Sequence, residues 1–151
     1  MRNGERDGRE MDAVAIIGKL REGIRSELEA EELTVNGFMI HTGFTYPDGD
    51  ELHIILSEDE GGWRFSDEGH TMMWLSYEDF NLTDSRRSML DRTLKGNGVS
   101  MDRGELYIGF DADTVCVALR SMIQAEIQVA DLLYLDKEIL RNTSAKGAQS
   151  P

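Results

Sequence analysis

The sequence has few of the residues and patterns that mark several large classes of protein. Cys116 is its only cysteine, which excludes an internal disulfide bond and a cysteine-based zinc cluster. A single thiol is typical of a reducing compartment, and no apolar run reaches the length of a secretory leader or a membrane span. We therefore predict a cytoplasmic protein. Only two prolines occur and 40% of the residues are hydrophobic, as in folded chains rather than disordered ones.

Basic residues are also scarce. The chain has 16 lysines and arginines against 29 aspartates and glutamates, so its formal net charge is −13 at pH 7. Because nucleic-acid binding requires basic side chains that neutralise phosphates, direct binding of DNA or RNA is not expected. A surface this acidic favours high solubility, metal cations or a basic protein partner.

The residues that are present indicate one domain between two tails. A chain of 151 residues can form one hydrophobic core but not comfortably two. We predict a single α+β domain over residues 12–140, with flexible tails over 1–11 and 141–151. Apolar residues at helical spacing predict long amphipathic helices over 13–31 and 114–140.

Signals for β-strands lie between these two helices. Alternating β-branched and aromatic residues predict strands over 34–44, 52–57 and 63–66, joined by glycine-containing turns. A later hairpin is predicted over 99–110. This order predicts a two-layer fold in which an antiparallel sheet, made of a meander of three strands plus a hairpin, is covered by the long N- and C-terminal helices.

The middle of the chain also resembles a known family. The residues that carry the likeness are Gly43-Phe44, Tyr46-Pro47-Asp48-Gly49-Asp50, Leu52-His53-Ile54, Phe65-Ser66-Asp67-Glu68-Gly69, Thr71 and Leu75. This pattern is similar to the family catalogued as domain of unknown function 1828, which comprises small prokaryotic domains, many of them on phages and other mobile elements. The resemblance covers about residues 33–135 and implies an α+β architecture and a mobile-element setting. It implies no catalytic residues, because the family has no established activity.

Acidic residues and a histidine gather at two corners of this central stretch. They are Asp48, Asp50, Glu51, Asp67, Glu68 and His70. If both corners lie at the same edge of the sheet, the carboxylates converge on a divalent-metal site, as in a metal-dependent hydrolase. The alternative is structural, because turns and helix caps require the same residue types. Gly69 then permits a sharp corner, and Asp67 or Thr71 caps the helix that follows.

Glu126 is predicted to point near the centre of the apolar face of the last helix. A carboxyl group is costly to bury there unless it is paired or hydrogen-bonded. Three interpretations stay open: a general acid or base with a displaced pKa, a buried structural pair, or a position that is exposed or lies at an interface. The expected partners are Arg64, His41, His53 or backbone N–H groups.

Large apolar residues crowd into residues 63–80. They are Trp63, Met72, Met73, Trp74, Tyr77 and Phe80. Some must form the core, and any surplus is expected at a partner site. Histidines lie nearby, and His41 or His53 beside a carboxylate gives an acid–base unit, although both can be ordinary sheet residues.

From these features we predict a small acidic interaction protein, linked to phages or other mobile elements, that acts by binding a protein partner. Basic clefts of nucleic-acid enzymes are a suitable target, because dense carboxylates can imitate a row of phosphates. The candidate binding residues are Asp48, Asp50, Trp63, Asp67, Glu68, His70 and Trp74, with Glu126 as a buried-charge candidate. We assign no catalytic residue, cofactor or metal ligand. The alternative function is a divalent-metal hydrolase that uses Asp48, Asp50, Asp67 and Glu68.

Overall fold

The computed structural model describes residues 12–35, 37–78 and 80–149, with side-chain surroundings up to Tyr134. The tail predicted over 1–11 lies outside these residues. In chain order the elements are α2 (Ala13–Glu27), β1 (Glu29–Glu32), β2 (Phe38–His41), β3 (Ile55–Asp59), β4 (Gly62–Ser66), α3 (His70–Tyr77), α4 (Asp84–Asn97), β5 (Ser100–Asp102), β6 (Glu105–Phe110) and α5 (Val115–Gln149). In the part of the chain that is described, no helix has both the length and the apolar character that crossing a membrane requires.

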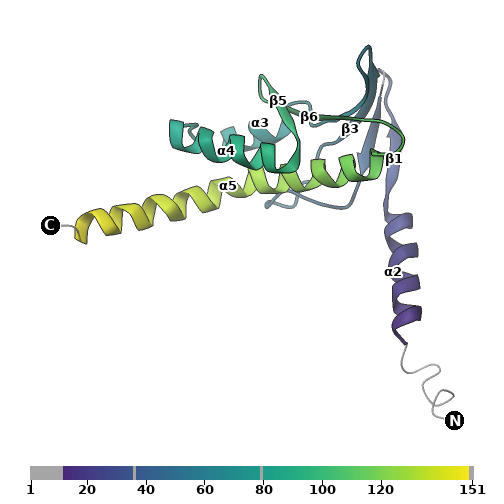
Figure 1. The fold of residues 1–151 in the computed structure, drawn as a ribbon, viewed down its shortest axis with the longest axis horizontal. Helices are drawn as coiled ribbons and strands as arrows, with labels where there is room; N and C mark the ends of the chain where they lie inside the picture. The colour runs from purple at the N-terminus through teal and green to yellow at the C-terminus, as the bar shows by residue number, and fades with distance from the viewer. Residues whose placement is uncertain (1–11, 36, 79, 150–151) are drawn as a thin grey trace, which may run out of the picture.

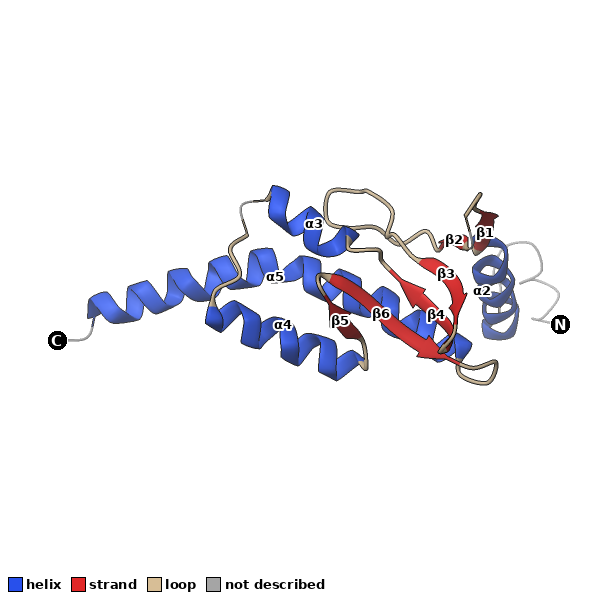
Figure 2. Ribbon diagram, turned by 90° about the horizontal axis from the view of Figure 1, so that it is seen from above, coloured by secondary structure: helices blue, strands red, loops and turns tan. Residues whose placement is uncertain are grey.

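The strands form one antiparallel sheet with the order β1-β2-β3-β4-β6-β5 (Figure 2). The predicted α+β fold, with a meander and a later hairpin, is confirmed. Strand β1 was not predicted, because its sequence Glu-Ala-Glu-Glu favours a helix and was read as the end of the first one. Its hydrogen bonds to β2, with Glu29 opposite His41 and Glu32 opposite Phe38, override that local preference.

The core lies between one face of the sheet and helix α5, which packs against β4, β6, α3 and α4. Leu56, Phe65 and Ile108 are register partners in a row across this face. The opposite face of the sheet is polar, as shown by Arg64, which binds Glu105 at 3.0 Å and lies over the ring of Tyr107. The sheet therefore has one covered face and one solvated face, as a two-layer fold requires.

Helix α2 takes no part in the cover that the sequence predicted for it. None of the described residues Ala13–Glu27 is buried, and Figure 1 shows the helix leaving the edge of the sheet and pointing away from the body. The physical reason is the course of β1, which carries the chain along the sheet edge, while α5 with its neighbours α3 and α4 already occupies the core face.

Helix α5 also differs from its predicted length. It continues to Gln149, past the expected end near Leu140 and into the segment 141–151 that was predicted to be a flexible tail (Figure 1). No proline interrupts this segment before Pro151, so the backbone hydrogen bonds of the helix can propagate through it.

Candidate functional site

The predicted turn at Pro47 is present and brings one side chain to helix α3. The Tyr46 N–H donates to the Asp50 carbonyl at 2.7 Å, and Gly49 has a φ of 95°, which glycine adopts easily. The turn leaves one Asp48 oxygen free to accept from the Nε1–H of Trp74 at 2.9 Å. The loop 42–54 is thereby tied to α3.

The predicted corner between β4 and α3 is built around Asp67, which is fully buried. Its Oδ1 accepts from the backbone N–H of Gly69 and of Leu106, both at 2.8 Å. Its Oδ2 accepts from the N–H of Thr71 at 3.0 Å. The expectation that Asp67 receives free N–H groups of the helix is confirmed, and Gly69 occupies the left-handed position before the helix with a φ of 80°.

Glu126 lies at the centre of a buried polar cluster formed by three distant segments. The Tyr46 hydroxyl donates to Glu126 Oε1 at 2.9 Å and lies 2.9 Å from Thr71 Oγ1. The Thr71 hydroxyl also donates to Glu126 Oε1, at 3.4 Å. Glu126 is fully buried, so of the three interpretations the buried structural one agrees with the geometry. The two hydroxyl partners were not predicted. Two of the expected partners are engaged elsewhere, Arg64 with Glu105 and His41 with Glu51 and Glu31, because the opposite face and the edge of the sheet hold them.

The surroundings keep Glu126 protonated at neutral pH. Burial, followed by the nearby charge of Asp67, raises the pKa of the Glu126 carboxyl group to about 9, against the smaller opposing effect of the hydroxyl hydrogen bonds. Burial also raises the pKa of Tyr46, which is therefore a neutral donor. Glu126 Oε2 is buried and has no hydrogen-bond partner among the described residues.

A cavity of about 450 Å³ lies beside this cluster, between the loop 42–54 and α3. Its lining residues are Tyr46, Asp50, Glu51, His53, His70, Met73, Trp74 and Tyr77. We call it the α3 pocket. Its floor is aromatic, because Tyr46 and Trp74 stack with ring centroids 5.7 Å apart and both are almost fully buried.

Two imidazoles form one wall of the α3 pocket. The rings of His53 and His70 stack at 3.6 Å with an angle of 5° between their planes, and His53 Nε2 lies 2.9 Å from Glu68 Oε1. Burial, and then the neighbouring imidazole of His53, lowers the pKa of His70. Since its ordinary value is 6.5, His70 is neutral at pH 7 and adds no positive charge to the wall.

Carboxylates form the rim of the α3 pocket. Asp50 and Glu51 are exposed there. Glu51 is held by His41, whose Nδ1 lies 2.5 Å from Glu51 Oε1 and whose Nε2 lies 3.2 Å from Glu31. These two hydrogen bonds raise the pKa of His41. The two histidines discussed as acid–base units are thus paired separately, His41 on β2 with Glu51 and Glu31, and His53 with Glu68.

Most of the predicted binding residues meet at the α3 pocket. Asp50, His70 and Trp74 line it, while Asp48 and Glu68 are hydrogen-bonded to lining residues. Asp67 is buried beneath the corner and does not face the pocket rim. Trp63 lies elsewhere, on β4.

Five lining residues were not among the predicted binding residues: Tyr46, Glu51, His53, Met73 and Tyr77. Other roles were considered from the sequence for Glu51, His53, Met73 and Tyr77, and none for Tyr46. A sequence signal for part of this set exists, because His70, Met73, Trp74 and Tyr77 follow the i, i+3, i+4, i+7 spacing of one helix face. The surplus of large apolar side chains expected from the sequence is also present, since Trp63, Met73 and Tyr77 are exposed.

The acidic corners do not assemble a metal site in the described part of the chain. No group of three or more His, Cys, Asp or Glu side chains there is placed to hold a metal ion. The positions of the individual carboxylates explain this, because Asp67 is used by backbone N–H groups and Asp48 by Trp74 and its own turn.

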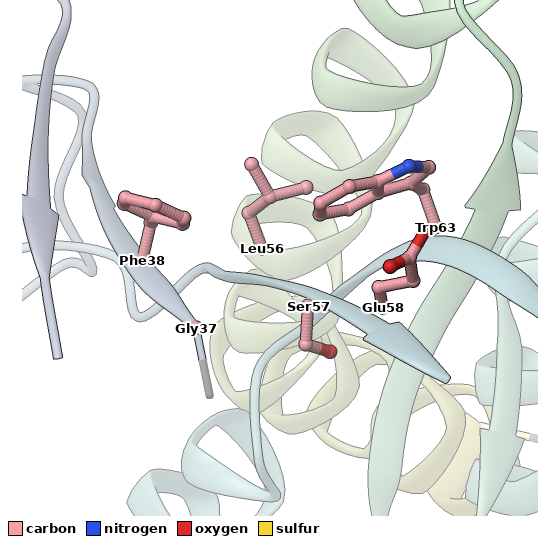
Figure 3. Close-up of a pocket in the computed structure, with 6 residues that line it drawn as sticks. All are labelled: Gly37, Phe38, Leu56, Ser57, Glu58 and Trp63. Carbon is pink, nitrogen blue, oxygen red and sulfur yellow. The ribbon is translucent and has the colours of Figure 1, made fainter. Parts of the chain in front are cut away.

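A second cavity, of about 300 Å³, contains Trp63. It is lined by Gly37, Phe38, Leu56, Ser57, Glu58 and Trp63 (Figure 3). The side chains of Phe38, Leu56 and Trp63 lie on the same side of the strands in Figure 3. We call this surface the Trp63 groove. Phe38 and Trp63 are 37% and 42% exposed, so the apolar face of the sheet continues here into solvent.

Comparison with known protein families gives one match, over residues 42–129, to the family described as domain of unknown function DUF1828. The match spans more than half of the chain. The chain belongs to the DUF1828 family. The DUF1828 segment contains every residue that lines the α3 pocket, together with Glu126, whereas α2 and β1 precede it. Comparisons with curated proteins and with solved structures found no match.

Proposed function

We propose that this protein is an acidic interaction domain that binds a basic side chain of a partner protein in the α3 pocket. The observation that carries the proposal is the combination of an aromatic floor and a carboxylate rim in one cavity. Its volume is in the range of sites that hold small ligands or single side chains. An arginine at the surface of a partner is the side chain that fits this chemistry best.

The floor supports recognition of a cation. A guanidinium group is attracted to the faces of aromatic rings, and its planar shape allows it to stack on them. Trp74 and Tyr46 are fixed by hydrogen bonds to Asp48 and Glu126, so little side-chain freedom is lost when a ligand binds. Tyr77 is 76% exposed, so its ring is free to rotate onto the bound arginine side chain.

The rim and the net charge support the same ligand. Asp50 and Glu51 offer carboxylate oxygens to the guanidinium, which binds carboxylates well. The methylene groups of the arginine can lie against Met73. Beyond the pocket, a net charge of −13 attracts a basic partner and raises the association rate, with an effect that weakens as salt increases.

A matched pair of peptides tests this proposal. Calorimetric titration should show that a short arginine-containing peptide binds at least about tenfold more tightly than the same peptide with neutral citrulline, because only the first carries the charge. Equal affinity for the two peptides, or no binding of either at millimolar concentration, would contradict the proposal.

Two pairs of variants place the binding in the pocket. Tyr77→Ala and Asp50→Asn should each weaken arginine-peptide binding by roughly three- to tenfold. Tyr134→Ala and Asp131→Asn make the same chemical changes at exposed positions of α5 and should leave the affinity unchanged.

The cellular setting is part of the proposal. The DUF1828 membership supports a link to phages or other mobile elements, and the single cysteine supports a cytoplasmic location. The neighbouring genes would direct the search for the partner: phage structural genes, a toxin gene and defence genes each point to a different kind of partner.

A further inference from the structure

Helix α2 presents an exposed apolar face. Its large hydrophobic side chains, with the capping residue Leu28, are between 42% and 79% exposed: Val14, Ile16, Ile17, Leu20, Ile24 and Leu28. Several follow helical spacing and therefore share one side of the helix. A contiguous apolar surface of this kind normally marks a protein contact.

The charge of α2 differs from that of the rest of the protein. Residues 1–28 contain six basic and six acidic residues, so the net charge of −13 belongs to residues 29–151. On α2 itself, Arg21 and Arg25 border the apolar side chains on one side, and the three basic residues of the helix outnumber its two glutamates. The helix thus combines an apolar stripe with one basic border, which suits an apolar groove with an acidic rim.

The Trp63 groove has these properties. Its apolar floor consists of Phe38, Leu56 and Trp63, and Glu58 is part of its lining (Figure 3). Glu58 is exposed and is the register partner of Trp63. An amphipathic helix that enters such a groove buries apolar area on both surfaces, and a basic border formed by Arg21 and Arg25 can meet the acidic rim.

The helix of the same chain is held away from this groove. Helix α2 enters β1 at Glu29, opposite His41, whereas the groove begins at Phe38, opposite Glu32 at the other end of β1. His41 also binds Glu31 and helps to fix β1 in place. Figure 1 shows α2 continuing outward from the sheet edge, so its own groove is reached only if β1 leaves β2.

We propose that the protein forms a two-fold dimer in which α2 of each copy occupies the Trp63 groove of the other. Every copy carries both the helix and the groove, so a reciprocal exchange covers all four apolar surfaces at once. Two copies arranged side by side and inverted place each helix at the groove end of its neighbour. Direct pairing of the two β1 edges is disfavoured, because each presents the sequence Glu-Ala-Glu-Glu.

Sedimentation velocity and light scattering on the full chain test this arrangement. We expect a mass of twice the 17.0 kDa of one chain. Ile17→Glu on the helix and Trp63→Glu in the groove should each raise the dimer dissociation constant at least about tenfold, because a charge replaces an apolar contact. Val117→Glu, at a 54% exposed valine of α5, is the matched control and should remain dimeric.

Mixing the variants separates the exchange from other modes of association. An equimolar mixture of Ile17→Glu and Trp63→Glu retains one intact helix–groove pair and should associate more strongly than either variant alone. A Trp63→Glu protein that stays dimeric indicates pairing of α2 with α2 and overturns the proposal. A wild-type protein that is monomeric at all concentrations overturns it as well, and leaves α2 for a different protein. Unchanged circular dichroism spectra of the variants show that the fold is intact.

Discussion

At the scale of single residues, two buried carboxyl groups, Asp67 and Glu126, differ in the donors that hydrogen-bond to them. Asp67 accepts three backbone N–H groups, which compensate the cost of burying a carboxylate. Glu126 receives the hydroxyl groups of Tyr46 and Thr71 and, as the smallest influence, the backbone N–H of His53, and its pKa is raised to about 9 by burial and by Asp67. Asp67 therefore holds the corner between β4 and α3. Glu126 is a neutral carboxyl group that holds Tyr46 in the floor of the α3 pocket.

Replacement of Glu126 by Gln should change how stability depends on pH. The pKa of Glu126 is raised from 4.5 to about 9 on folding, so the folded state keeps a proton that the unfolded state loses in between. Its contribution is fully present below pH 4.5 and is lost as the pH rises to about 9, by up to about 1.4 kcal/mol per pH unit. In the Glu126→Gln variant the side chain at this position does not titrate, so this part of the fall in the free energy of unfolding is absent.

Urea unfolding at pH 5.5 and pH 8 measures this effect. The free energy of unfolding of the wild type should fall by about 3 kcal/mol more than that of Glu126→Gln between these two values. Taking the difference between the two proteins removes the titration of the histidines, which both contain. Parallel pH profiles would show that Glu126 is ionised in the folded protein.

At the scale of elements, the corner between β4 and α3 fixes the pocket. Asp67 connects the start of α3 to the backbone of Leu106 on β6, and Thr71 continues from this corner into the Glu126 cluster. Asp67 therefore helps to set the orientation of α3, and with it the positions of His70 and Trp74.

Asp67→Asn should therefore destabilise the protein. The amide retains one acceptor oxygen but turns an N–H₂ group toward backbone donors, and we expect a loss of about 2–3 kcal/mol in the free energy of unfolding. Asp50→Asn makes the same change at an exposed position and should alter stability by less than about 0.5 kcal/mol. Chemical denaturation of both variants provides the measurement. Similar stabilities for the two would remove Asp67 from its organising role.

Local sequence signals predicted the turns and corners well, because the backbone conformation of a turn depends on the residues within it. The Pro47 turn needs glycine at a positive φ, and the Asp67 corner needs an acceptor beside Gly69. Features that depend on contacts between distant segments could not be predicted in this way. Strand β1 depends on pairing with β2, and the exposure of α2 depends on where β1 leads the chain, so neither is contained in the local pattern. The hydroxyl partners of Glu126 come from segments 80 and 55 residues away.

At the scale of the whole molecule, the two proposed contacts use different surfaces. The α3 pocket lies between the loop 42–54 and α3, within the DUF1828 segment. Helix α2 and β1 precede that segment. Recognition of a basic partner and self-association can therefore be tested independently, and a dimer would present two α3 pockets to a partner with repeated basic residues.

The central claim, that a cationic side chain binds over Trp74, can be tested by the two indole N–H signals in a nitrogen–proton NMR spectrum. The Trp63→Phe variant assigns them. During titration with an arginine-containing peptide, we expect the Trp74 signal, whose N–H is bonded to Asp48, to shift in a saturable manner while the Trp63 signal stays in place. The citrulline peptide should leave both unchanged. A shift of Trp63 with Trp74 unaffected, or no shift of either signal, would contradict the account.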